Sequence, residues 1–187
     1  EHAKAADYYE QARDLDFENV NYLEALARAQ FFAERYDEAV DSLQELIDHE
    51  DYKAPAWVYA MLGDSYMAMR RPRDARDAYT RATDMQPSSA GVWSNLAKAA
   101  LAANDANRAV LSARQSLQLD PGQLDSKLIM GYALIRSRQT ERAVRFLTES
   151  IPMHPQNATL RCLLGLALSA IGEHGQALEC YSRALQL

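Results

Sequence analysis

The sequence predicts an all-α fold in which antiparallel helical hairpins stack into an α-α superhelix, a solenoid. Good helix formers such as Ala, Leu, Glu, Arg and Gln dominate the 187 residues, whereas only seven Gly and six Pro occur. Prolines recur at an interval of 34 residues, and so does a set of alanines. A strict period between about 20 and 50 residues is typical of a solenoid. The residues at this interval are Pro87, Pro121 and Pro155, and Ala75, Ala109, Ala143 and Ala177.

The repeat interval divides the chain into six segments of a single array, 1–187. Residues 1–19 are expected to form the second helix of a partial repeat. Residues 20–55 are expected to form a complete repeat with a two-residue insertion, Ala54-Pro55. The remaining repeats are predicted at 56–89, 90–123, 124–157 and 158–187, of which the last is truncated.

The clearest motif lies in residues 56–89, where Tyr59, Leu62-Gly63 and Tyr66 precede Ala75, Tyr79, Ala82 and Pro87. The other repeats keep a large residue followed by a small one, at Leu96-Ala97, Met130-Gly131 and Leu164-Gly165. This pattern resembles the tetratricopeptide repeat (TPR), with Tyr where that family has Trp and Phe. The resemblance covers nearly the whole chain. It implies that each repeat is a helical hairpin and that the first helices line a concave groove for extended or helical peptides.

Small and cyclic residues predict details of the packing. Gly63 and Gly131 are expected to face Ala75 and Ala143, so that the two backbones of a hairpin approach closely. Prolines at the repeat ends are expected to stop each second helix, because proline lacks an N–H group. Pro152 falls earlier, and should shorten its helix by about one turn.

Charge is distributed unevenly along the chain. Residues 1–55 hold 15 acidic and 5 basic side chains, whereas residues 56–187 hold 11 acidic and 15 basic ones. This balance argues against non-specific binding of nucleic acid. The absence of any run of about 20 apolar residues argues against membrane insertion. With only two cysteines, Cys162 and Cys180, and no signal-peptide pattern, we expect a cytoplasmic location.

The two ends predict that the chain is part of a longer array. It begins with a lone second helix and ends with Ala184-Leu185-Gln186-Leu187, an apolar sequence where solvent is expected. A terminal repeat normally has a polar outer face. An alternative is that a partner covers this end.

Sequence motifs for catalysis do not occur. We find no phosphate-binding loop, dinucleotide-binding glycine pattern, nucleophile elbow or His-Glu-x-x-His zinc motif. The four histidines are scattered and do not cluster with other ligands. We therefore predict no catalytic residues, no cofactor and no metal, and a protein that is not an enzyme.

The helical period predicts which first-helix residues face the groove, because residues at spacings 0, +4 and +7 share one face. Several of these residues and their neighbours form an apolar patch, namely Leu128, Ile129, Tyr132, Cys162, Leu163 and Leu166. This patch is either an interface, or its side chains are hidden by tight curvature of the array or by a following repeat that is missing here. Trp57 is either a binding hot spot or packs against the preceding turn. The predicted groove residues are Glu24, Arg28, Trp57, Asp64, Met67, Asn95, Lys98, Leu128, Tyr132, Ile135, Cys162 and Leu166.

Two groove specialisations of the TPR family do not fit. The carboxylate clamp needs Lys and Asn where this chain has Ala60 and Asp64, and only Asn95 matches its middle position. The asparagine ladder of the O-linked sugar transferases likewise matches only at Asn95. The groove is therefore expected to bind by another chemistry.

These observations predict a protein-protein interaction scaffold or adaptor that binds a peptide or helix of a partner in its groove. Two alternatives remain. The chain is the regulatory or targeting arm of a larger multidomain enzyme, or it is a structural module that self-associates.

Overall fold

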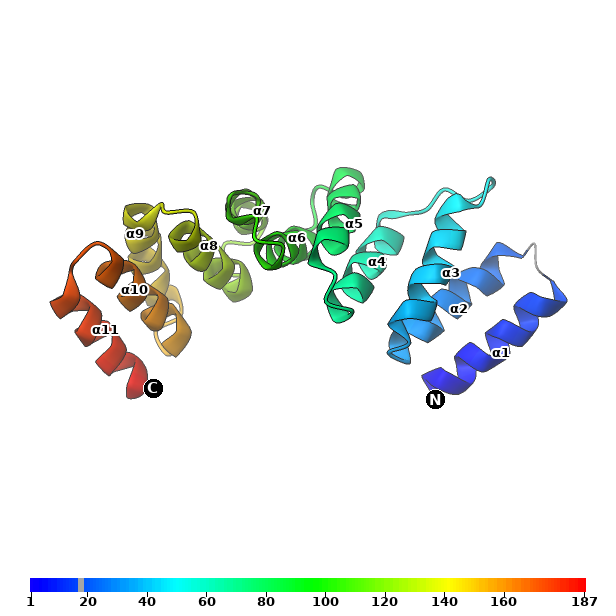
Figure 1. The fold of residues 1–187 in the computed structure, drawn as a ribbon, viewed down its shortest axis with the longest axis horizontal. Helices are drawn as coiled ribbons and strands as arrows, with labels where there is room; N and C mark the ends of the chain where they lie inside the picture. The colour runs from blue at the N-terminus through cyan, green and yellow to red at the C-terminus, as the bar shows by residue number, and fades with distance from the viewer. Residues whose placement is uncertain (17–18) are drawn as a thin grey trace. The chain divides into compact units, whose positions relative to one another are not determined.

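The protein is described by a computed structural model that covers residues 1–16 and 19–187, and within these residues it contains eleven α-helices, one short 3-10 helix and no strand (Figure 1). The prediction of an all-α helical-repeat fold is confirmed. The predicted boundary between the segments 1–19 and 20–55 includes Phe17 and Glu18, which lie outside the described residues.

Even-numbered helices are the first helices of the repeats, and odd-numbered helices are the second helices. The first helices are α2 (Val20–Phe32), α4 (Ala56–Ala68), α6 (Ala90–Ala102), α8 (Leu124–Arg136) and α10 (Ala158–Ala170). The second helices are α1 (His2–Leu15), α3 (Tyr36–Asp48), α5 (Pro72–Met85), α7 (Ala106–Leu119), α9 (Thr140–Ser150) and α11 (His174–Leu185).

The helices group into two compact units, unit 1 (Glu1–Pro87) and unit 2 (Ser88–Leu187). In each unit every helix packs against its neighbour in the chain. In unit 2 the first helices of consecutive repeats also touch, because α8 contacts both α6 and α10. A hairpin therefore buries its apolar face against the next hairpin, as expected of a solenoid.

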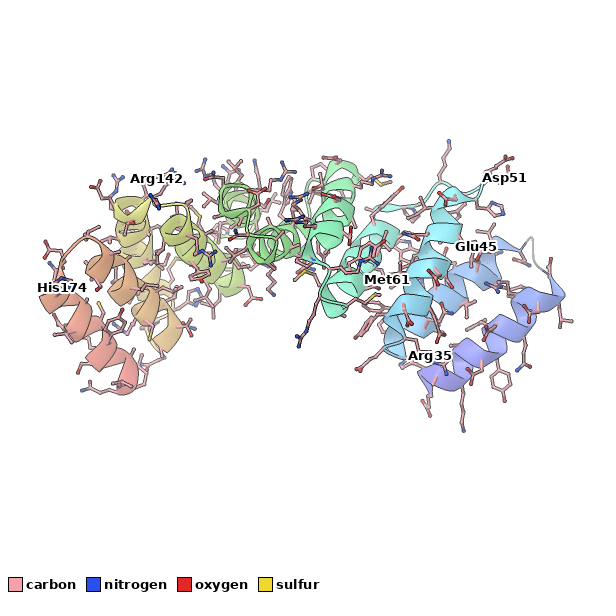
Figure 2. All side chains as sticks on the ribbon, viewed as in Figure 1. Arg35, Glu45, Asp51, Met61, Arg142 and His174 are labelled. Carbon is pink, nitrogen blue, oxygen red and sulfur yellow. The ribbon has the colours of Figure 1, made fainter. Side chains whose placement is uncertain are left out.

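Helix α1 is attached to the rest of unit 1 by ion pairs as well as by apolar packing. Arg35, in the turn after α2, bonds Asp7 of α1 at 2.9 Å (Figure 2). Arg13 of α1 lies 3.4 Å from Glu45 of α3. Ala6, which is 1% exposed, packs with Leu26 of α2. Helix α1 thus contacts both helices of the repeat that follows it.

The turn inside each complete hairpin has one residue with positive φ. In the turn from α8 to α9, Arg138 has φ 60°. Its N–H bonds the carbonyl of Ile135, and the N–H of Gln139 bonds the carbonyl of Leu134. This pair of bonds ends a helix with a left-handed residue, a position that favours glycine. The equivalent residues are Glu34, Arg70, Asn104 and Gly172, so only one of the five turns has glycine.

The glycines of the first helices make room for large side chains of the second helices, which the sequence analysis did not predict. A Cβ on Gly131 would lie 2.6 Å from Cδ2 of Leu147, and one on Gly63 would lie 2.7 Å from the ring of Tyr79. The side chain nearest to each glycine thus belongs to the residue one turn beyond Ala75 or Ala143, and the predicted approach to those alanines stays a prediction. The physical reason is size, since a buried ring or leucine needs the space that a missing Cβ leaves.

The prolines act as predicted. Helix α9 has 11 residues, whereas α5 and α7 each have 14. After Ser150 the backbone tightens into a 3-10 turn, Ile151–Met153, which contains Pro152. The predicted shortening by about one turn is thus confirmed. Pro72 occupies the first turn of α5, where its missing N–H costs nothing.

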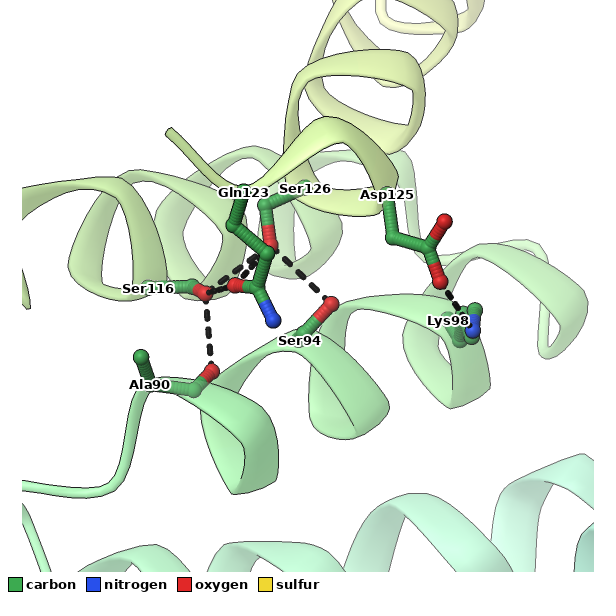
Figure 3. A network of polar contacts seen from close by, with 7 residues as sticks. All are labelled: Ala90, Ser94, Lys98, Ser116, Gln123, Asp125 and Ser126. Atoms are coloured by element: carbon green, nitrogen blue, oxygen red, sulfur yellow. Dashed lines mark hydrogen bonds and ion pairs between the residues drawn. The ribbon is translucent and has the colours of Figure 1, made fainter. Parts of the chain in front are cut away.

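Buried hydroxyl groups link two repeats of unit 2 (Figure 3). The hydroxyl of Ser126, at the start of α8, lies 3.0 Å from that of Ser94 on α6 and 2.8 Å from that of Ser116 on α7. Ser116 also bonds the carbonyl oxygen of Ala90 at 2.8 Å, and both Ser116 and Ser126 reach the side chain of Gln123. Because buried polar groups are costly when unpaired, the network specifies how α8 sits on the preceding hairpin.

Candidate functional site

In unit 1, four predicted or neighbouring side chains form a connected cluster, which we call the Arg28 cluster. Arg28 and Glu24 of α2 form an ion pair at 2.9 Å. The Arg28 guanidinium lies 4.0 Å from the ring centre of Trp57, on α4. Tyr52, in the connection between α3 and α4, donates a hydrogen bond of 3.1 Å to Glu24. The cluster thus joins the first helices of two consecutive repeats.

The environment of the Arg28 cluster keeps the Tyr52 hydroxyl protonated. Burial, and then the bond to Glu24, raises the pKa of Tyr52 to about 12, so its hydroxyl remains a donor. The Arg28 side chain is 47% exposed and forms an ion pair with Glu24. Trp57 is half-buried, and its contact with Arg28 is a cation–π interaction. The cluster therefore offers a partly exposed surface that combines an aromatic ring with charged groups.

The next predicted groove residues of unit 1 are partly committed to the fold. Asp64 of α4 accepts a hydrogen bond of 2.5 Å from the hydroxyl of Tyr79 on α5. Burial and this bond raise the pKa of Tyr79. Met67, one turn after Asp64, is half-buried. Asp64 thus contributes to packing within its own hairpin.

In unit 2 the polar groove residues lie on α6 and α8. Lys98 and Asp125 form an ion pair at 2.8 Å, with side chains 48% and 57% exposed (Figure 3). Asn95 is half-buried. Further along α8, Arg136 lies 5.8 Å from the ring centre of Tyr132 and donates a 3.3 Å hydrogen bond to its hydroxyl.

The predicted apolar patch divides into a buried and an exposed part. Ile129 belongs to the core and is 8% exposed. Leu128, Ile135 and Leu163 are half-buried against that core. In contrast, Cys162 is exposed and Leu166 is 41% exposed. Tyr132, which is the equivalent of Leu166 in the preceding repeat, is half-buried. We call these three residues the exposed apolar surface: Tyr132, Cys162 and Leu166.

One buried ionisable group stands outside the predicted site. Lys127 of α8 is 3% exposed, and its ammonium nitrogen lies 2.9 Å from the sulfur of Met153 and 3.3 Å from Nε2 of His154. Burial lowers the pKa of Lys127, against an opposing effect of Asp120. Its place in the repeat is that of Tyr59, so a lysine stem fills a position where another repeat has an aromatic ring.

The described residues contain neither a cluster of metal ligands nor a membrane-spanning helix. Within residues 1–16 and 19–187, no group of three or more His, Cys, Asp or Glu side chains is placed to hold a metal ion. In that part of the chain, no helix has the length and hydrophobicity needed to cross a bilayer.

Fold and surface together define a helical-repeat protein of the kind that serves as an interaction scaffold. Family models of the tetratricopeptide repeat match residues 60–123 and 158–187. The chain belongs to the tetratricopeptide repeat family.

Known proteins resemble this chain chiefly in fold. The solved structure of MamA superposes with a TM-score of 0.81 at 16% identity, covering 89% of this chain and 90% of MamA. YrrB, a TPR protein with an unusual peptide-binding site, also gives a TM-score of 0.81, at 14% identity and with coverage of 97% and 93%. Mouse (Mus musculus) DnaJ homolog subfamily C member 7 is 27% identical over 114 residues, or 61% of this chain. That alignment spans only 23% of the mouse protein.

Two features of the site differ from the sequence-based account. Tyr52, which donates a hydrogen bond to Glu24, was not predicted, since it lies in the connection between α3 and α4 and not on a first helix. Its only signal was an aromatic residue close to the two-residue insertion. Trp57 contacts the Arg28 guanidinium, a contact that neither interpretation of this residue included.

Proposed function

We propose that the protein is an interaction scaffold whose unit 2 binds an apolar segment of a partner protein along α8 and α10. The observation that carries the proposal is the exposure of Leu166, which is 41% exposed on a helix whose opposite stripe is core. An apolar residue on a helix that is apolar elsewhere is normally buried. Cys162, one turn earlier on α10, extends the same surface.

Neighbouring polar groups support a peptide-like partner. Arg136 and Tyr132 offer hydrogen-bond donors beside the exposed apolar surface, and Lys98 and Asp125 offer both charges on adjacent helices. Interfaces commonly combine an apolar centre with a polar rim. YrrB, which shares this fold, is a TPR protein with a peptide-binding site, and this supports the same class of ligand here.

In unit 1 we propose that the Arg28 cluster adds a contact for a polar or aromatic partner residue. Trp and Arg are the residue types most enriched among binding hot spots. Because Glu24 and Tyr52 hold Arg28 in place, little side-chain entropy is lost when a partner binds.

The experiment compares two substitutions of exposed leucines in unit 2. Leu166→Asp places a charge on the exposed apolar surface, whereas Leu178→Asp places one on α11, where Leu178 is 69% exposed. A photo-crosslinking group at position 132 should yield one defined partner band in cell extract. We expect Leu166→Asp to abolish that band and Leu178→Asp to preserve it, with helical content unchanged in both. Loss in both variants, or in neither, contradicts the proposal.

A further inference from the structure

Unit 2 contains a hollow between its second helices α9 and α11, above α10. Its volume is about 320 Å³, the lower end of the range of small-molecule pockets, which is roughly 300–1,000 Å³. The floor is apolar and includes Ile151, Leu164 and Leu168. The rim includes Arg161 and Arg183. The hollow thus combines an apolar floor with positive charge at its edge.

This hollow is separate from the proposed partner surface. Arg161, Leu164 and Leu168 follow one another at helical spacing on α10 and form one stripe. Cys162 and Leu166 belong to another stripe of the same helix, and neither lines the hollow. A ligand in the hollow would leave the exposed apolar surface free.

Unit 1 has an equivalent hollow of about 450 Å³, whose lining residues all have a counterpart in the hollow of unit 2. The two differ in charge. Three aspartates, Asp48, Asp74 and Asp77, line the hollow of unit 1. In unit 2 the lining has one acidic residue, Glu179, and it is paired with Arg183 at 2.6 Å. The same architecture therefore provides an acidic hollow and a basic one.

Arg161 has a donor that the protein does not use. One terminal nitrogen donates to the carbonyl of Pro155 at 2.9 Å. The Nε–H group is buried and has no hydrogen-bond partner. An unpaired buried donor is costly, and in native structures it calls for an explanation such as an absent ligand. A carboxylate is the acceptor that an arginine fork matches best.

We propose that this hollow binds a small aliphatic carboxylate. The hydrocarbon chain would lie on Leu164 and Leu168, and the carboxylate would pair with the guanidinium of Arg161 at the rim. The charge of the whole unit favours an anion, since residues 88–187 hold 10 Lys and Arg against 7 Asp and Glu. This proposal does not depend on the partner surface.

The two cysteines provide a direct measurement. Cys180 lines the hollow, where burial, and then Glu179, raises the pKa of its thiol, whereas Cys162 is exposed on the other stripe. Alkylation of each thiol by iodoacetamide is followed by mass spectrometry with butyrate, hexanoate or hexylamine. We expect hexanoate to slow alkylation of Cys180 and to leave Cys162 unchanged. Hexanoate should bind roughly fifteenfold more tightly than butyrate, because it buries two more methylene groups.

Three outcomes of that measurement overturn the proposal. Hexanoate fails to protect Cys180, or it protects Cys162 equally, or hexylamine protects Cys180 as well as hexanoate does. The last result would mean that apolar contact alone decides binding and that Arg161 does not recognise the carboxylate.

Calorimetry of variants with hexanoate tests the apolar part of the hollow and Arg161 separately. Cys180→Phe should abolish binding by filling the hollow, because the preceding repeat already holds Phe146 at this place, packed on the core. Ala78→Phe, which fills the hollow of unit 1, should have no effect. Arg161→Gln should weaken hexanoate roughly tenfold and leave hexan-1-ol unchanged, whereas the exposed Arg145→Gln should change neither. Unaltered affinity in Cys180→Phe, or in Arg161→Gln, refutes the proposed site.

Discussion

The contact between Gly131 and Leu147 allows a quantitative test of how the hairpins pack. Leu147 is fully buried, and a Cβ on Gly131 would approach its Cδ2 to 2.6 Å and its Cγ to 3.2 Å. Alanine at 131 must therefore displace a packed leucine, at a cost of about 1–3 kcal/mol. Its better helix propensity returns about 1 kcal/mol. We expect Gly131→Ala to destabilise the protein by about 1 kcal/mol.

Removing the leucine should reverse the sign of that effect. Leu147→Ala alone leaves a cavity and should cost about 2–5 kcal/mol. In that background the new methyl group at 131 enters the vacated space and keeps its gain in helix propensity. Gly131→Ala should then stabilise by about 1 kcal/mol, which gives a coupling energy near 2 kcal/mol. The pair Ala97 and Ala113, both fully buried at the equivalent places, already shows the small-small combination.

Urea denaturation of the four proteins measures this coupling, with the m-value checked because repeat proteins can unfold in parts. Hydrogen exchange of α8 and α9 amides shows whether the change is local. Gly91→Ala is the control, since nothing lies within 4 Å of a Cβ there. It should have the same small stabilising effect in both backgrounds. If Gly131→Ala has the same sign with and without Leu147, the packing argument is refuted.

Four further variants probe other features of unit 2. Lys127→Met should stabilise by about 1 kcal/mol at pH 7. The folded-state pKa of Lys127 lies below the value of 10.5 of the free side chain, so burying the charged lysine destabilises the unmodified protein less as the pH rises from the folded-state pKa to 10.5. The free energies of unfolding of the unmodified protein and of Lys127→Met, measured from pH 7 to 10.5, should therefore converge. Arg138→Gly should raise the melting temperature by relieving φ 60°, and Arg142→Gly, inside α9, should lower it. Ser126→Ala should cost about 1–3 kcal/mol in urea denaturation, because Ser94 loses its partner on α8.

The helices were predictable from sequence because the repeat interval fixes the register independently of local propensity. Ala75 and its counterparts mark one face of every second helix, and prolines mark the ends. The pairing of Gly63 was not predictable in the same way. Ala75 and Tyr79 lie one turn apart on the same face, and spacing alone does not tell which of the two side chains lies nearest to the Cβ position of Gly63. Only the size of the tyrosine ring, weighed against the missing Cβ, would have identified it.

The sequence predicted which face of the first helices carries the candidate site, but not how deeply each side chain on that face is buried. Helical spacing placed Ile129 and Leu166 together in one apolar patch, yet Ile129 is core and Leu166 is exposed. How far each side chain is covered depends on the stacking of neighbouring helices, which a single-helix period does not contain. Tyr52 was missed because it lies in the connection between α3 and α4, whereas the helical spacing applies only to residues on the first helices.

Within this fold, chemical differences between repeats arise at positions that the repeat pattern leaves free. The place occupied by Ala78 in one hairpin is occupied by Phe146 in another and by Cys180 in a third. The first and third line hollows, whereas Phe146 packs against the core. The backbone remains constant because the pattern residues carry the stacking, so one substitution at a free position can open or fill a hollow. This is why the variants Cys180→Phe and Ala78→Phe should alter ligand access without altering the fold, and why a loss of helical content in either would contradict the division between pattern and free positions.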